Sequence, residues 1–291
     1  MHFGNPIASL ITSGVDFIKG DIRDLNLCSY VVKDIDVIIH LAGIVTDALV
    51  DMNPGMARAV NIIGMDGLIT KAQKAGVKRF IYASSSSVYG STLEDATEAT
   101  PCKPETEYAQ IKLDGESMVF AAKGLITCAV RSATCSGPSA RMRLDTIVNT
   151  FSSQAWFKHY IEVWDGTQWR SNVNVLDIAR LYYLLICAEE SAINHQIFNA
   201  TTENHQALEL ANLVADVHFE YDGGRPEIIV DDTKRDTRQY RMNASKVMKA
   251  LDWHPQWSIA ETIRENFRFF GAGGIVDPDS SLYQIRSEWN V

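Results

Sequence analysis

Hydrophobic runs and helical patterns alternate along most of the chain. Apolar runs at residues 36–43, 79–83 and 125–133 are typical of strands buried on both faces of a parallel sheet. Between them, residues 54–75 and 105–123 carry apolar side chains at helical spacing, and a glycine follows each segment. This alternation predicts an α/β fold built on a doubly wound, Rossmann-like parallel sheet.

The second half of the chain continues the alternation less regularly. The pattern predicts helices at 176–190, 205–217 and 259–270, and strands at 15–22, 160–164, 170–175, 197–201 and 227–230. The triplet Asp165-Gly166-Thr167 between two of these strands predicts a hairpin. We expect residues 1–140 to form a nucleotide-binding part. Residues 141–291 should form mainly a smaller substrate-binding part, with 176–201 returning to the first.

A tyrosine and a lysine in the segment Y-A-Q-I-K are one helical turn apart. Tyr108 and Lys112 should therefore lie on the same helix face. A free phenol titrates near about 10, and an adjacent ammonium favours the phenolate. Tyr108 is thus a candidate acid/base near neutral pH. A serine at the end of the strand predicted at 79–83 could hydrogen-bond the same substrate oxygen.

The serine-rich strand end S-S-S-S-V-Y-G, followed by Y-A-Q-I-K, resembles a known family. The chain is similar, from about Val15 to Phe270, to the extended short-chain dehydrogenase/reductases, in particular the NAD-dependent nucleotide-sugar epimerase/dehydratase group. The resemblance implies that Ser85, Tyr108 and Lys112 are the catalytic residues.

The same resemblance implies NAD as cofactor, with NADP as an alternative. It assigns Asp21 and Ile22 to the adenine, and Leu41, Ala42 and Gly43 to the phosphates and ribose. Other residues carried over from the family are Asn61, which supports the active-site backbone, Ala133, and the pair Tyr108 and Lys112. Taken without the resemblance, Asp21 is as well explained as a turn residue capping a helix at Leu25, and His40 is better explained as a core residue at a strand end.

The substrate implied by the resemblance is a nucleotide-diphosphate sugar. The candidate residues for binding it are Ser86, Thr134, Arg143, Asn149, Arg170 and Arg238. Arginine suits a diphosphate because its planar fork can donate two hydrogen bonds. The chain departs from the family pattern at Thr134, where relatives have asparagine, and at Asn174, where they have histidine.

The residues after Ser85 distinguish reactions within the family. Sugar 4,6-dehydratases resembling this chain carry an Asp-Glu pair there, and the fucose-forming epimerase-reductases carry a cysteine at the second position. Ser86-Ser87 therefore disfavours both reactions and favours a 4-epimerase. The alternatives are an NAD(P)H-dependent nucleotide-sugar ketoreductase and a non-catalytic remnant that cannot bind NAD.

The composition argues against several classes of partner. There are 27 lysines and arginines against 36 aspartates and glutamates, a net charge of −9 without a basic run, so nucleic acid is not expected. Five scattered cysteines without C-x-x-C spacing indicate reduced thiols in a cytoplasm and no metal site. No apolar segment is long enough for a membrane span. The resemblance implies a homodimer formed by the helices at 54–75 and 105–123, with Met118 and Val119 in an outward apolar strip.

The glycine fingerprint G-x-x-G-x-x-G, which binds the pyrophosphate of a dinucleotide at a helix N-terminus, is absent from the sequence. Relatives carry it in a β-α-β unit that would precede Phe3. We therefore expect an N-terminally truncated sheet and weak or absent NAD binding by the chain as written.

Overall fold

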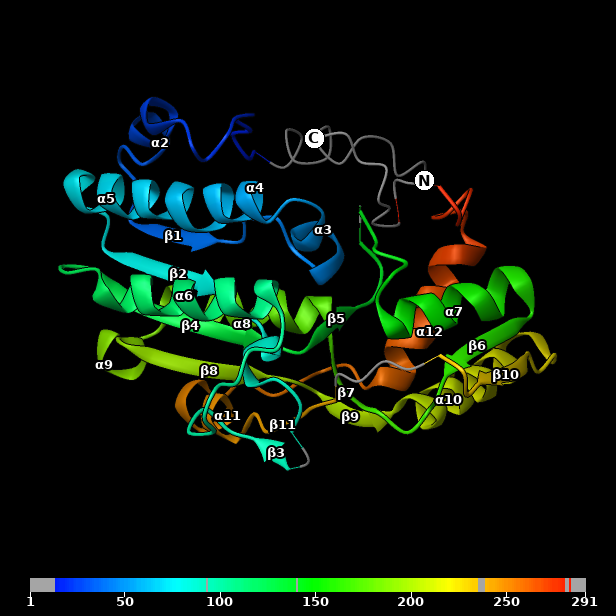
Figure 1. The fold of residues 1–291 in the computed structure, drawn as a ribbon. Coiled ribbons are helices and arrows are strands. Elements are labelled where there is room, and N and C mark those ends of the chain that lie inside the picture. The colour runs from blue at the N-terminus through cyan, green and yellow to red at the C-terminus, as the bar shows by residue number, and fades with distance from the viewer. Residues whose placement is uncertain (1–13, 93, 140, 235–238, 281–282, 284–291) are drawn as a thin grey trace.

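The computed structural model describes residues 14–92, 94–139, 141–234, 239–280 and 283. Its main sheet has the strand order β1-β2-β4-β8 and is parallel throughout. These strands are Val37–His40, Arg79–Ala83, Ile126–Ser132 and Gln196–Ala200. Figure 1 shows them stacked from β1 down to β8. Three of the four correspond closely to the apolar runs of the sequence, and the fourth to the run at 197–201.

Helices cover both faces of this sheet, as a doubly wound fold requires. One face packs against α2 (Leu25–Val31), α5 (Met65–Ala75) and α6 (Glu107–Ala121), and the other against α8 (Val175–Cys187) and α11 (Ser245–Leu251). Successive residues of a strand point to opposite faces. Accordingly Phe80 packs in the hydrophobic core under α2, α5 and α6, and Ile81 packs in the core under α8 and α11. Both faces being buried explains why the strands are apolar without alternation.

A third hydrophobic core lies in the C-terminal part, at the right of Figure 1. It is formed by α7 (Ile147–Lys158), α10 (Ala207–Asp222), α12 (Ile259–Gly271) and β6 (Tyr160–Trp164), which pairs in parallel with β10 (Glu227–Asp231). The remaining elements are α3 (Asp47–Met52), α4 (Pro54–Arg58), η1 (Ala59–Gly64), η2 (Ser86–Tyr89), β3 (Asp95–Ala96), β5 (Thr134–Ser136), β7 (Trp169–Asn174), α9 (Glu190–Ile193), β9 (Glu203–Gln206) and β11 (Arg241–Met242).

The helix predicted at 54–75 is continuous but changes type in its middle. Asn53 caps it by accepting a hydrogen bond from the backbone of Met56, and Gly76, with φ of 78°, ends it in the left-handed conformation. Between α4 and α5, the segment η1 is a π-helix. Such a turn inserts one extra residue into the helical phase and is frequent at functional sites.

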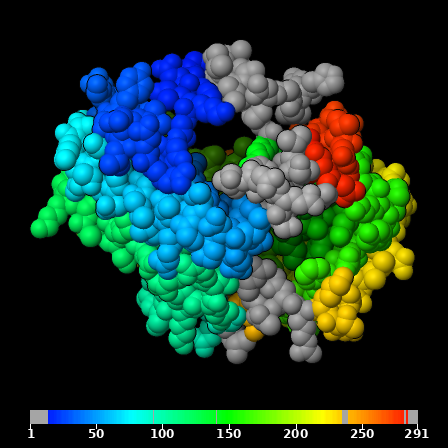
Figure 2. Space-filling model, turned by 45° about the horizontal axis from the view of Figure 1, so that its top comes forward, coloured from blue at the N-terminus to red at the C-terminus, as the bar shows by residue number. Residues whose placement is uncertain are grey.

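The strand predicted at 15–22 is wrong. These residues have irregular structure, and Val15, Phe17 and Ile18 are exposed. A strand needs a neighbour for its backbone hydrogen bonds. Within the described part of the chain, β1 pairs with β2 alone, so residues 15–22 have no strand beside them to join. Figure 2 shows a hollow between this blue segment and the green residues of the C-terminal part.

Two further expectations are corrected. Strands β6 and β7 flank Asp165-Gly166-Thr167 but do not form a hairpin, because β6 pairs with β10 whereas β7 pairs with β5 and β9. Val119 does not face outward: it is fully buried against the main sheet, and Met118 is partly buried beside it.

Among the described residues, no helix combines the length and the apolar character needed to cross a membrane.

Candidate active site

Ser85, Tyr108 and Lys112 are brought together at the carboxyl end of β2. Ser85 follows the strand and caps the short helix η2. Helix α6 begins after Thr106, whose side chain accepts a hydrogen bond from the backbone of Ala109 (3.2 Å), and carries both Tyr108 and Lys112. The helix can lie close to β2 because Gly115 faces Tyr82, where a Cβ would come within 2.3 Å of the phenol oxygen.

The Ser85 hydroxyl is oriented by its neighbour Ser87. Its oxygen accepts a hydrogen bond from the Ser87 hydroxyl (2.8 Å) and another from the Ser87 backbone N–H (3.2 Å). A serine oxygen has two lone pairs and one proton. With both lone pairs in use, the Ser85 proton is left to donate elsewhere, and interaction with Ser85 acts to lower the pKa of the neighbouring Tyr108 phenol.

Lys112 is held rigidly. Its ammonium donates to the Ala83 carbonyl oxygen (2.7 Å), and it lies 5.1 Å from the Tyr82 ring centroid and 5.9 Å from that of Tyr108. The residue is only 7% exposed. Burial, partly offset by the negative charge of Glu116, lowers the pKa of Lys112 to about 8. The lysine is therefore close to losing its proton just above neutral pH.

The expected acidity of Tyr108 is not what these surroundings produce. Burial raises the pKa of Tyr108 to about 12, and the hydrogen bond from Ser85 and the charge of Arg143 oppose this rise only in part. The reason is geometric: the Lys112 ammonium points to the Ala83 carbonyl and not to the phenol oxygen. The cation on the same helix face does not by itself make Tyr108 an acidic phenol.

We predict that Lys112→Met changes the pH dependence of stability. The folded pKa of about 8 is below the unfolded value of about 10.4. The unfolded wild type therefore binds more protons between these values, and wild-type stability rises with pH in this window. Between pH 7 and pH 11, the unfolding free energy of the wild type should rise by about 3 kcal/mol more than that of Lys112→Met. Urea denaturation of both proteins measures this. The exposed Lys123→Met is the control, and a pH-independent difference would contradict the assigned burial.

The loop after β1 has the features of a dinucleotide site at the ribose end. Residues Leu41, Ala42 and Gly43 are exposed. Asn61, on the π-helix, accepts from the Ile44 backbone N–H (2.7 Å) and donates to the Ile44 carbonyl (2.8 Å). A Cβ at Gly43 would approach the Asn61 side-chain oxygen to 2.8 Å, so the backbone there is close-packed as well as exposed. These residues, with Tyr108 and Lys112, fit the ribose and nicotinamide end of NAD.

The other cofactor candidates are less clearly placed. Asp21 is in a turn and pairs with Arg23, which holds the pKa of the Asp21 carboxyl well below its usual range. Asp24, not Asp21, caps the helix that begins at Leu25, by accepting from Asn26 and Leu27. Ala133 is buried between β4 and β5. His40 is buried and stacks on Tyr82, as expected of a core residue.

Two of the substrate candidates have well-defined partners. Arg143 forms two hydrogen bonds with the Asp145 carboxylate (2.9 and 3.1 Å), and its charge acts on Tyr108. Asn149 is buried, and its amide accepts from the Gly137 backbone N–H and donates to the Arg143 carbonyl. Asn149 therefore fixes the loop that carries Arg143, and its amide is already engaged.

The remaining candidates differ in exposure. Arg170 is 7% exposed and donates to the Trp169 carbonyl, Ser86 is 2% exposed, and Thr134 is partly buried on β5. Arg238 lies outside the described residues.

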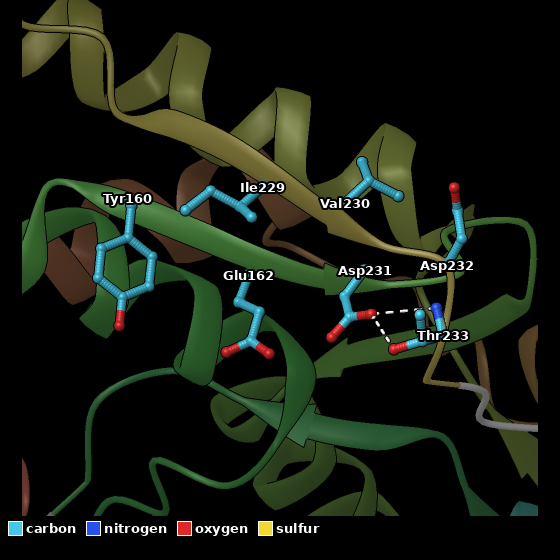
Figure 3. Close-up of a pocket in the computed structure, with 7 residues that line it drawn as sticks. All are labelled: Tyr160, Glu162, Ile229, Val230, Asp231, Asp232 and Thr233. Atoms are coloured by element: carbon cyan, nitrogen blue, oxygen red, sulfur yellow. Dashed lines mark hydrogen bonds between the residues drawn. The ribbon is translucent and has the colours of Figure 1, made fainter.

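A surface pocket of about 560 Å³ lies along the paired strands β6 and β10, and neither Ser85, Tyr108 nor Lys112 lines it. Figure 3 shows it lined by Tyr160, Glu162, Ile229, Val230, Asp231, Asp232 and Thr233, with Asp231 accepting two hydrogen bonds from Thr233. Three carboxylates line this pocket, which disfavours an anionic diphosphate. None of the predicted site residues belongs to it.

Two residues that the sequence reasoning did not assign to the site make direct contacts in it. Ser87, which in the sequence argues only against dehydration and against the fucose-forming epimerase-reductases, donates to the Ser85 oxygen. Glu116 accepts from Ser84 and forms an ion pair with Arg131. The sequence feature that could have identified Glu116 is its spacing, one helical turn after Lys112.

The chain is similar to known proteins over most of its length. Residues 4–201 match the family model described as NAD dependent epimerase/dehydratase family. The low-salt glycan biosynthesis protein Agl12 of Haloferax volcanii is 28% identical over 256 residues, 84% of this chain and 78% of its own length. A 3 beta-hydroxysteroid dehydrogenase/Delta 5-->4-isomerase of Mycobacterium tuberculosis is 33% identical over 40% of this chain and 35% of its own length.

Among solved structures, UDP-glucuronic acid 4-epimerase from Bacillus cereus, in complex with UDP-glucuronic acid and NAD, has the same fold. The TM-score is 0.80 at 23% identity, covering 91% of this chain and 85% of that one. The family match covers more than half of the chain and includes the strand end with Ser85 and the helix with Tyr108 and Lys112. The chain belongs to the NAD-dependent epimerase/dehydratase family.

Proposed function

We propose that this protein is an NAD-dependent 4-epimerase of a nucleotide-diphosphate sugar. One observation supports the proposal: Ser87 occupies both lone pairs of the Ser85 hydroxyl, which leaves the Ser85 proton to donate, in a site where Tyr108 lies beside the Lys112 ammonium. This arrangement offers a hydrogen-bond donor and an acid/base at one substrate oxygen.

The proton steps belong to the chain's own residues. Tyr108, as phenolate, accepts the proton of the sugar hydroxyl as that carbon is oxidised to a ketone. Ser85 donates a hydrogen bond to the ketone oxygen. The Lys112 ammonium, bonded to the Ala83 carbonyl in this structure, turns toward Tyr108 to stabilise the phenolate and holds the nicotinamide ribose. When bound, NAD supplies the hydride acceptor and then the hydride donor. Tyr108 returns its proton to the ketone oxygen when the carbon is reduced from its opposite face, which inverts that carbon.

The short helix η2 favours epimerisation over water elimination. Elimination needs an additional acid and base next to the ketone. Ser86 and Ser87 provide hydroxyls with no carboxyl group at these positions, and the Ser87 hydroxyl is already committed to Ser85. A ketoreductase would use the same trio. It is distinguished by net consumption of reduced cofactor.

Purified protein incubated with NAD and a panel of UDP-, dTDP-, GDP- and CDP-sugars tests the proposal. Chromatography with mass spectrometry should detect a product of unchanged mass that is the 4-epimer, with no net formation of NADH. Loss of water from the substrate would contradict the 4-epimerase and indicate a dehydratase. Stoichiometric oxidation of NAD(P)H on a keto-sugar would indicate the reductase.

We predict that Arg143→Ala weakens binding of the nucleotide diphosphate. A charge-assisted hydrogen bond is worth about 1.5–3 kcal/mol, so the dissociation constant should rise about 10- to 150-fold. Titration calorimetry with UDP, dTDP and GDP measures this. Arg264→Ala, which removes an arginine from an ion pair with Glu220 on the C-terminal helices, is the matched control. Equal affinities in wild type and Arg143→Ala would remove Arg143 from the site.

A further inference from the structure

Two side chains on one face of α6 hold the end of β2. Lys112 donates to the Ala83 carbonyl (2.7 Å), and Glu116, one turn later, accepts a hydrogen bond from the Ser84 hydroxyl. The next residue is Ser85. The backbone that presents the catalytic serine is therefore attached at two successive residues to the helix that presents the catalytic tyrosine.

Glu116 is itself held by a buried arginine. Arg131, on the neighbouring strand β4, donates to both carboxylate oxygens of Glu116 (2.8 and 2.7 Å), and each side chain is 4% exposed. Arg131 also lies over the ring of Tyr89, 4.8 Å from its centroid, and the Tyr89 hydroxyl donates to Asn199 on β8 (2.7 Å). This network connects the carboxyl ends of three adjacent strands.

A contribution to stability does not by itself explain the buried ion pair of Glu116 and Arg131. Desolvation of two charges generally offsets most of their attraction, and apolar replacements of similar volume are often as stable. A buried pair that lies one helical turn from a buried ammonium has another available role, because it brings a fixed negative charge next to the cation.

Charged and titratable groups on β1, β2, β4 and α6 lie around Lys112. His40 on β1, Tyr82 on β2 and Tyr108 on α6 are neutral near pH 7, since burial and the Lys112 charge lower the His40 pKa to about 4 and burial raises the pKa of both phenols. Arg131 on β4 lies behind the Glu116 carboxylate. Glu116 is the anion that acts on Lys112 and opposes the effect of burial.

We propose that Glu116 is a positioning residue of this site: through its ion pair with Arg131 it keeps the Lys112 ammonium charged and fixes the Ser84–Ser85 backbone. The proposal rests on the proposed function for its catalytic meaning, but the state of Lys112 can be measured without a substrate. Without Glu116, Lys112 loses its proton at lower pH, and a neutral amine cannot stabilise the Tyr108 phenolate.

The test is a titration of lysine side chains by NMR in protein labelled with ¹³C-lysine, with Lys112→Met assigning the signal. In wild type we expect a midpoint near pH 8. Glu116→Gln should lower it by about one unit, the usual effect of losing one adjacent opposite charge. The double variant Glu116→Leu/Arg131→Met, which leaves no buried charge uncompensated, should fold and show the same direction of shift.

Asp114→Asn is the matched control. It removes a carboxylate from the same helix, two residues away, that contacts Arg58 and Gln110 on the surface. We expect no shift of the Lys112 midpoint in this variant. A midpoint in the double variant equal to that of wild type would overturn the proposal, as would an equal shift in Asp114→Asn.

The two proposals fail separately. A shifted Lys112 midpoint with no conversion of any nucleotide sugar would count against the 4-epimerase and leave the electrostatic role of Glu116 in place. Where conversion is found, the alkaline limb of kcat/KM should move to lower pH in Glu116→Gln by the same amount as the NMR midpoint. An active enzyme whose pH profile and midpoint do not move would sink the Glu116 proposal alone.

Discussion

Tyr108→Phe should lower kcat by about 10²–10⁴-fold, the usual contribution of a positioned general acid/base. The substitution removes one oxygen and keeps the ring that packs beside Lys112 and Ile111. Affinity for the nucleotide diphosphate should be unchanged, because the phenol acts at the sugar hydroxyl. Single-turnover conversion of the sugar identified in the substrate panel, together with calorimetric binding of its nucleotide, separates the two quantities.

The matched control is Tyr183→Phe. This tyrosine on α8 is 65% exposed and makes no contact with the trio, so its hydroxyl should be dispensable. If Tyr108→Phe retained wild-type kcat while Tyr183→Phe behaved as expected, the acid/base would have to be another group.

Asp177→Ala should destabilise the fold by about 3–5 kcal/mol. Its fully buried carboxylate accepts from the backbone of Gln256 (2.9 and 3.0 Å) and Trp257 (3.2 Å) and pairs with Arg180 (2.8 Å). Each hydrogen bond to a charged group contributes about 1.5–3 kcal/mol, and water restores part of the loss in the variant. Because Asp177 is in the first turn of α8 and the segment it binds leads into α12, the change loosens the connection between the main sheet and the C-terminal core.

Guanidinium denaturation measures this effect. Asp177→Asn, which keeps one acceptor oxygen, should lose less than Asp177→Ala. Asp252→Asn is the control: Asp252 is in the loop that Asp177 binds, its side chain is 97% exposed, and asparagine tolerates its positive φ of 50°, so this change should be close to neutral. Equal stabilities of Asp177→Ala and Asp252→Asn would show that the buried carboxylate is not needed.

Local patterns sufficed for much of the fold. The strands of the main sheet and the helix end at Gly76 follow from periodicity and from turn and cap residues within a few positions of each other, whereas α6 begins after Thr106 and ends at Ala121, inside the helix expected at 105–123. Pairing between distant segments did not follow. Residues 15–22 look like a strand but have no neighbour among the described residues, and the strands around Asp165 belong to different sheets.

The candidate site shows the same division. The proximity of Ser85, Tyr108 and Lys112 is encoded by a strand end and one helical turn. The ionisation of these groups is not, because it depends on burial and on a carbonyl from another segment, which directs Lys112 away from the phenol oxygen. Likewise the pairing of Arg143 with Asp145 and of Glu116 with Arg131 could be known only from side-chain positions.

The π-helix Ala59–Gly64 lies between two α-helical stretches of the helix from Pro54 to Ala75 and carries Asn61, which bonds the loop after β1. Beyond it, Met65, Leu68 and Ala72 pack against the sheet. A π-turn holds one more residue than an α-turn, so the extra residue is taken up locally as a bulge. Deleting a single residue here, even the exposed Ile63, should leave an uninterrupted α-helix whose two ends keep their directions, but without the bulge that presents Asn61 to Ile44. The extra residue therefore serves the loop after β1 and is dispensable for packing on the sheet.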